Sequence, residues 1–198
     1  MHFQDISHDT ETCYALEENE QRVFFLLNRS GDITFELRGP RAAAYVFAFC
    51  IGTDTTKTDL TISQKHLAPH TTSRVLVKSV LHDAAHFSYR GLLHIAKTAV
   101  RSDASQENRN LLLSKDARAA SEPMLEILTH DVKCHHAATT SPLNTEQLAF
   151  LRSRGLSDLA AKKILIHGFI HSSVESMETL LSSHDQEKVV ALIGKSLT

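Results

Sequence analysis

Two side chains that can bind iron lie two residues apart in the short β-prone segment Val132–His136. If that segment is a strand, Cys134 and His136 point to one face, because side chains alternate along a strand. Lys133 and His135 then point to the opposite face. A thiolate and an imidazole both suit iron, and iron–sulfur sites can mix Cys and His ligands. Such a site normally takes four ligands, so two donors imply a labile site or one that a partner chain completes. The residues alone leave a second interpretation open, a thiol packed in the core.

Other histidines have metal-ligand spacing without the local structure for it. Three pairs are four residues apart, a spacing that brings two imidazoles together on a helix: His66/His70, His82/His86 and His167/His171. Only the last pair lies in a predicted helix, and it lacks the intervening glutamate of a zinc protease. We interpret all three pairs as solvated or hydrogen-bonded histidines. His130 and His135 flank the Cys134 segment and could supply or tune a ligand there. Cys13 and Cys50 have apolar neighbours, which predicts buried thiols.

Motifs for nucleotide binding and for acid–base catalysis are missing from the sequence. Neither GxxxxGK[ST] nor GxGxxG occurs, so the chain is expected to have no nucleotide site of its own. Glu126 has no second carboxylate placed beside it for acid–base work. We therefore predict that the chain is not an enzyme.

Composition is that of an ordinary globular domain. The 198 residues are 42% hydrophobic and carry a formal net charge of −2, which gives no reason to expect nucleic acid or an anionic membrane as a partner. No stretch approaches the ~20 apolar residues of a membrane-spanning helix. The opening residues lack the pattern of a secretory signal. Three separated cysteines without a CxxC pair fit reduced thiols. Together these features predict a cytoplasmic protein.

Residues 1–140 are predicted to form a β domain. Its short runs rich in Val, Ile, Thr and Phe are Gln21–Asn28, Asp32–Arg38, Ala44–Ile51, Thr58–Ser63, Arg74–Leu81, His86–Ile95, Asn110–Ser114, Met124–Leu128 and Val132–His136. No helix of ordinary length separates them, which leaves a sandwich, a barrel or a solenoid. Hairpin signals are scarce, and this mildly favours parallel coils of roughly 20 residues. The pattern alone does not decide between the sandwich and the solenoid.

Residues 141–198 are predicted to form a small helical domain. Asn144 can cap a first helix that stops at Gly155. Ser157 can cap a second helix that runs on through Ile170, with Gly168 as a weak point. A third is expected from Ser183 to Gly194. Arg152 and Arg154 could contact a partner or cap the first helix, and we favour the cap for Arg154.

A longer motif in the second half of the β region resembles the signature of a known family. Its pieces occur in order over about 50 residues: Gln106, Asn110–Ser114, Pro123, Leu125–Ile127, Asp131–Cys134, His136, Ala138–Thr139 and Leu151–Gly155. They resemble the SufB/SufD family, the scaffold subunits of the SUF iron–sulfur assembly machine, and the Lys-Cys-x-His form is closer to SufD. Upstream, Arg74–Gly91 is similar to a coil of the same family. His135 and Ala137 depart from the usual Ser and Gly. Family members are longer and begin with a helical region, so the chain is either a fragment or a shortened member.

The resemblance implies a right-handed parallel β-helix followed by a small C-terminal α-helical domain. It also implies a non-enzymatic subunit of a SufBCD complex, which pairs through its β-helix with SufB, or with itself as a homodimer, and docks the SufC ATPase on its helices. In the family a cluster is built where two β-helices meet, and the matching histidine here is His136. A purely structural, oligomerising β-helix is the first alternative. A β-helix enzyme acting on acidic polysaccharide is the second, although the Asp residues are scattered.

Overall fold

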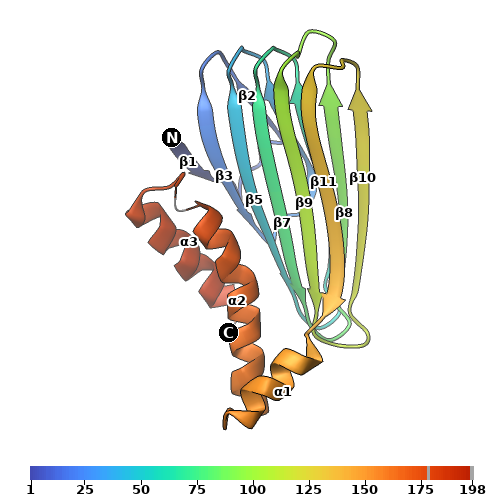
Figure 1. The fold of residues 1–198 in the computed structure, drawn as a ribbon, viewed down its shortest axis with the longest axis vertical. Helices are drawn as coiled ribbons and strands as arrows, with labels where there is room; N and C mark the ends of the chain where they lie inside the picture. The colour runs from blue at the N-terminus through green and yellow to red at the C-terminus, as the bar shows by residue number, and fades with distance from the viewer. Residues whose placement is uncertain (178, 197–198) are drawn as a thin grey trace.

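The computed structural model describes residues 1–177 and 179–196; the last two residues of the predicted helical domain lie outside this range. In the described residues, eleven strands precede three helices, α1 (Thr145–Ser153), α2 (Asp158–Met177) and α3 (Ser183–Ser196). The strands wind into a β-solenoid with two sheets (Figure 1). The first sheet contains β1 (His2–Asp5), β3 (Gln21–Leu27), β5 (Ala43–Gly52), β7 (Thr72–Leu81), β9 (Ser102–Leu112) and β11 (Val132–Pro142). The second contains β2 (Cys13–Leu16), β4 (Gly31–Leu37), β6 (Lys57–His66), β8 (His86–Ile95) and β10 (Arg118–Ile127).

All neighbouring strands pair in parallel, which confirms the parallel β-helix and excludes the sandwich. The coil length expected from the sequence is too short for most of the solenoid. One turn runs from Ala43 to its partner Thr72, and the next runs from Thr72 to its partner Asp103. Long strands on both sheets, such as β6, β7 and β8 with 10 residues each, give the coils this length. Two short strands, β1 and β2, were not predicted.

Residues in the left-handed conformation turn the chain at the corners where hairpin signals are missing. Asn28, Asp54 and Asp83 have φ values of 52°, 55° and 47°. Asn and Asp tolerate this region better than other residues with a Cβ atom. The corners also stack, because the Asn28 side chain accepts the Ile51 amide at 2.7 Å. Polar corner residues therefore take the role that Asn-Gly turns have in antiparallel sheets.

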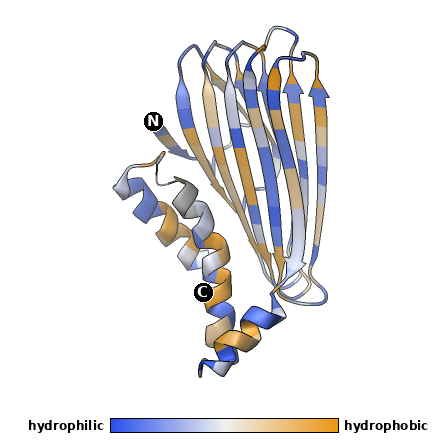
Figure 2. Ribbon diagram, viewed as in Figure 1, coloured by the Kyte–Doolittle hydropathy of each residue, from blue (hydrophilic) through white to orange (hydrophobic). Residues whose placement is uncertain are grey.

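The solenoid lumen changes from apolar to polar along its length. In the early coils Phe24 packs against both Tyr14 and Phe35, with ring centroids 5.2 and 4.8 Å away. In the later coils the buried residues include amides, hydroxyls and an imidazole: Gln64, His66, Thr71, Ser73, Ser79, Ser102, Gln106, Asn108 and Asn110. Figure 2 shows hydrophobic and hydrophilic residues alternating along the strands, as expected when successive side chains point in and out.

Helices α2 and α3 lie against the outer face of the first sheet (Figure 1). Val23 and Phe25 on that face belong to one buried cluster with Ile170 of α2 and Val189 of α3. Strands β3 and β5 are thus buried on both faces, which explains why their sequences are continuous apolar runs. Lys78 of β7 lies under α2, where its ammonium group donates to the Phe169 carbonyl oxygen and to Ser172 Oγ.

The predicted helix signals agree with the structure. The Asn144 side chain accepts the amides of Glu146 and Gln147 at 2.9 and 3.0 Å. Arg154 is the C-cap residue of α1, and Gly155 follows with a φ of 90°. Gly168 does not interrupt α2, which continues to Met177.

Candidate functional site

The candidate site lies on β11, the edge strand of the first sheet. β11 pairs with β9 alone, and β10 is the corresponding edge strand of the second sheet. No further coil of the described chain covers these two strands, so most of their side chains are exposed. The backbone groups on the free edge of β11 have no strand partner among the described residues. Such an edge can pair with a strand of another chain.

Cys134 and His136 both occupy the lumen-facing side of this edge strand. They pair in register with Ala104 and Gln106, which are buried residues on the inner face of β9. Residues that pair in neighbouring parallel strands project to the same side. The two donors are therefore on one face, and both are exposed because the lumen opens at this end. The alternative of a packed core thiol does not hold for Cys134.

Partial burial and the nearby Asp103 carboxylate raise the pKa of the Cys134 thiol. No cationic side chain of the described residues opposes this rise, so the thiol stays protonated at neutral pH. A metal ion would displace that proton, because cysteine binds metals as the thiolate. Cys134 is thus a protonated thiol and not a preformed nucleophile.

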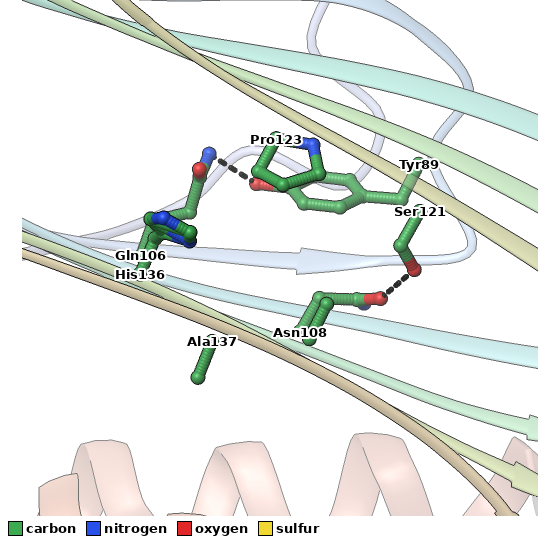
Figure 3. Close-up of a pocket in the computed structure, with 8 residues that line it drawn as sticks. Tyr89, Gln106, Asn108, Ser121, Pro123, His136 and Ala137 are labelled. Carbon is green, nitrogen blue, oxygen red and sulfur yellow. Dashed lines mark hydrogen bonds between the residues drawn. The ribbon is translucent and has the colours of Figure 1, made fainter.

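A small cavity of about 10 Å³ lies beside His136 (Figure 3). Its lining consists of Tyr89, Gln106, Asn108, Ser121, Pro123, His136, Ala137 and Ala138. The Gln106 side-chain amide donates to the Tyr89 hydroxyl at 2.9 Å, and burial raises the pKa of that hydroxyl. Gln106 Oε1 is buried without a hydrogen-bond partner in the described structure. Gly91 makes room for this amide, since a Cβ there would lie 1.9 Å from Gln106 Nε2.

Asparagine side chains hold the edge strand to the rest of the solenoid. Asn110 accepts the Ser79 hydroxyl at 2.7 Å and donates to Thr140 Oγ1 at 3.1 Å, so it links β7, β9 and β11. Ser121 of β10 donates to Asn108 Oδ1. These bonds hold β10 and β11 of the last coil to β9.

Sequence reasoning missed this polar support. It predicted only Asn110–Ser114 of β9, because the inward positions of Ser102–Leu112 are mostly polar and give no hydrophobic alternation. Gln106 belongs to the family motif, but the sequence gives its side chain no structural or chemical role. Only the true coil length, which the sequence pattern underestimates, places Gln106 in register with His136.

The remaining candidate histidines include exposed residues and one that is buried and hydrogen-bonded. His135 and His130 are exposed, and His135 faces away from Cys134. His66 is buried and bonded to Thr71 Oγ1 at 2.7 Å, in agreement with its interpretation as a hydrogen-bonded histidine. His167 and His171 stack on α2 with ring centroids 5.6 Å apart.

The two other cysteines differ in exposure. Cys50 is buried, and this burial raises its pKa to about 11. The prediction of a buried Cys13 is wrong, because Cys13 begins the short strand β2 at the other edge of the second sheet and is exposed.

Apolar side chains lie close to the two donors at the open end. On β10, Leu125 and Ile127 are 43% and 39% exposed. They pair in register with Leu93 and Ile95, which are buried on the inner face of β8, so they share the lumen side with His136. In the described residues no three His, Cys, Asp or Glu side chains gather as a metal site. The open end thus offers two donors and an apolar rim.

A second apolar surface lies on the helices. Glu146, Gln147, Phe150 and Leu151 of α1 and Ile164 and Leu165 of α2 line an open groove of about 400 Å³. Phe150 is 57% exposed and Ile164 47%. No helix among the described residues is both long and apolar enough to cross a membrane.

Comparison with known proteins identifies the family. Residues 28–169 match the family described as SUF system FeS cluster assembly, SufBD core domain. The chain is 36% identical over 125 residues to the iron–sulfur cluster assembly protein SufD of Escherichia coli (strain K12), which covers 63% of this chain and 29% of that protein. It is 37% identical over 118 residues to a SufBD family protein of Synechocystis sp., covering 60% of this chain and 26% of the relative.

A third relative is the iron–sulfur cluster assembly protein SufB of Bacillus subtilis, 32% identical over 105 residues, with 53% of this chain and 23% of the relative covered. The chain thus spans less than a third of the length of these curated relatives. The family match covers most of the solenoid, the first helix and much of the second. The chain therefore belongs to the SufBD family of the SUF system for iron–sulfur cluster assembly.

Proposed function

We propose that the chain is a SufD-like scaffold subunit of the SUF system, which offers His136 and Cys134 as ligands to a nascent iron–sulfur cluster. The observation that carries the proposal is the position of both donors on the uncovered lumen face of an edge strand. The cluster is the cargo of this scaffold, and the chain itself catalyses no reaction. Its reduced thiols suit the cytoplasm.

Two donors cannot hold a cluster that takes four ligands, so the proposal requires a second chain. The free edge of β11 offers backbone groups for pairing, and Leu125 and Ile127 offer apolar surface beside them. SufB is the partner that the family suggests, and a second copy of this chain is the alternative. In either case the partner supplies the missing ligands from its own strand edge.

The chemistry at the site starts from a protonated thiol. When iron reaches the open end, the imidazole of His136 can bind it as a neutral ligand. Cys134 can follow by releasing its proton to water, because its raised pKa keeps it protonated only while no metal is near. Because this chain supplies only two of the ligands, it cannot hold the cluster alone, which suits a scaffold whose cluster must later leave.

We further propose that the helices dock the SufC ATPase. The groove that contains Phe150 and Ile164 is an exposed apolar surface suited to a partner. α2 is packed on the first sheet and bonded to Lys78, so a movement of the helices would be transmitted to the solenoid. ATP binding by SufC could in this way open or close the cluster site.

Anaerobic reconstitution with iron and sulfide in the presence of SufB tests the ligand role. We expect wild type to support a cluster, measured by its absorption and by bound iron, and His136→Ala to lose most of it. His135→Ala is the matched control, because it removes an exposed imidazole from the opposite face of the same strand. Equal cluster content in all three proteins would contradict the proposal.

Co-purification tests the docking of SufC. Phe150→Asp and Ile164→Glu should abolish co-elution with SufC, because each buries a charge in the apolar contact. Val190→Glu on α3 is the control, since Val190 is also exposed but lies outside the groove. Co-elution that survives both groove variants would show that SufC binds elsewhere.

The apolar rim also favours a second candidate, a structural β-helix that pairs without metal. If the chain pairs with SufB but no cluster forms with wild type or His136→Ala, this structural role is the correct one.

A further inference from the structure

A groove of about 450 Å³ lies where the solenoid corners meet the helices. One wall is a stack of three corners, with His82 after β7, Leu113 after β9 and Leu143 after β11. These corners are adjacent because Leu81 and Pro142 both pair with Leu112. The opposite wall is a stripe along α2, closed at one side by α3: Leu159, Lys162, Lys163, Ile166, His167 and Gly194.

The lining combines an apolar floor with cationic side chains. Leu113, Leu143 and Ile166 belong to the cluster that joins the helices to the first sheet. Lys162 is already paired with Asp158, at 2.7 Å. Lys163 has no ion pair in the part of the chain that the structure describes, and no carboxylate from that part lines the groove. An occupant with an apolar body and one negative charge would match both features.

Gly194 of α3 lines one side of the groove without a side chain. A Cβ on Gly194 would meet no atom within 4 Å, so the helix leaves space that a side chain could fill. The volume is typical of small-molecule sites, and the junction between two structural units is a usual place for them.

We propose that this groove binds a small amphipathic anion. Its hydrocarbon or aromatic body would pack on Leu113, Leu143 and Ile166, and its carboxylate or phosphate would bind Lys163. Because such a ligand would touch both the solenoid corners and α2, it would hold the helices in their observed position. The proposal does not depend on iron binding at His136.

Titration calorimetry on the full chain tests the proposal, with decanoate and decyl phosphate below their micelle concentrations as probes. We expect saturable binding at one site and a raised thermal midpoint. Decanol, which has the same body without the charge, should bind at least about tenfold more weakly, as should decanoate to Lys163→Gln, since a charged contact contributes about 1.4 kcal/mol or more.

Gly194→Leu is the blocking variant, and Gly168→Leu is its matched control. Both positions are helical glycines whose added Cβ meets open space, but only Gly194 lines the groove. Binding should be lost in Gly194→Leu and unchanged in Gly168→Leu, and circular dichroism will establish that both variants fold. Lys163→Gln provides the independent test should Gly194→Leu fail to fold. No saturable binding to wild type, equal binding of decanol, or full binding to Gly194→Leu would each overturn the proposal.

Discussion

Two histidines on the lumen side of this solenoid differ in whether another coil covers them. His66 is fully buried, and both ring nitrogens are within 2.8 Å of a hydroxyl, on Thr71 and Ser73. His136 lies on the lumen side of the uncovered strand β11 and is exposed. The same residue type is therefore structural in the middle of the solenoid and available for binding at its end.

His66 should make the protein acid-sensitive. Burial lowers the pKa of His66 from 6.5 to about 4. Between these pH values His66 is protonated in the unfolded chain and neutral in the folded chain. The stability it contributes is complete above pH 6.5 and is lost as the pH falls towards 4. At pH 5 the loss is about 2 kcal/mol.

Urea unfolding of wild type and His66→Gln at pH 7 and pH 5 measures this effect. The difference in free energy of unfolding between the two proteins should shrink by that amount at pH 5. His135→Gln, at an exposed position, should follow wild type at both pH values. If the difference in free energy of unfolding between wild type and His66→Gln is the same at both pH values, His66 does not cause the acid sensitivity.

The position of the Gln106 amide depends on Gly91. A methyl group at residue 91 would overlap the amide, which is held by Tyr89. We expect Gly91→Ala to lower the free energy of unfolding by about 1–3 kcal/mol, the usual cost of overpacking. The double variant Gly91→Ala/Gln106→Ala should recover part of this loss in the same urea experiment. Additive losses would show that the two residues do not compete for space.

At the scale of elements, one buried lysine joins the helices to the solenoid. Lys78 projects from β7 into the apolar layer under α2, with its ammonium group 4.7 Å from the Phe169 ring centroid. Burial lowers its pKa from 10.5 to about 8. Between these values the unfolded chain holds a proton that the folded chain has released, so the free energy of unfolding rises with pH.

Replacing Lys78 tests this junction. The rise in stability between pH 8 and pH 10.5 should reach up to about 3 kcal/mol in wild type and be absent from Lys78→Met. At pH 7 Lys78→Met should be at least as stable as wild type, because a methionine fills the same space without a buried charge. The measurement is urea unfolding at a series of pH values. The same rise in both proteins would assign it to other groups, such as tyrosines.

Sequence patterns predicted the longer elements that have an apolar face. They missed the short strands β1 and β2 and the polar parts of β9 and β10. β3 and β5 stand out because both of their faces are buried, and α1 because Asn144 and Gly155 mark its ends. β9 has an amide-lined inner face, which no hydrophobic period reveals. Periodicity left the choice between sandwich and solenoid open, since strand pairing depends on contacts between residues a full coil apart in the chain. The family motif decided it.

At the scale of the molecule, the solenoid has ends of different character. The early coils are filled with aromatic rings, and the last coil exposes a thiol, an imidazole and an apolar rim. Most polar residues in the later lumen are hydrogen-bonded to one another, as buried polar groups usually are. Under the proposed function, this open end is the surface that another chain covers.

Charge placed on the rim should prevent that pairing. Leu125 and Ile127 face the opening, whereas Met124, at 45% exposure, lies on the outer face of the same strand. Burying a leucine side chain contributes about 1.5–3 kcal/mol, so Leu125→Glu should weaken association with SufB, or with a second copy, by more than about tenfold. Sedimentation velocity at several concentrations measures this association. Met124→Glu adds the same charge at the neighbouring residue without touching the rim, and it should associate as wild type does. If both variants associate equally well, the partner covers a different surface and the cluster site must be completed in another way.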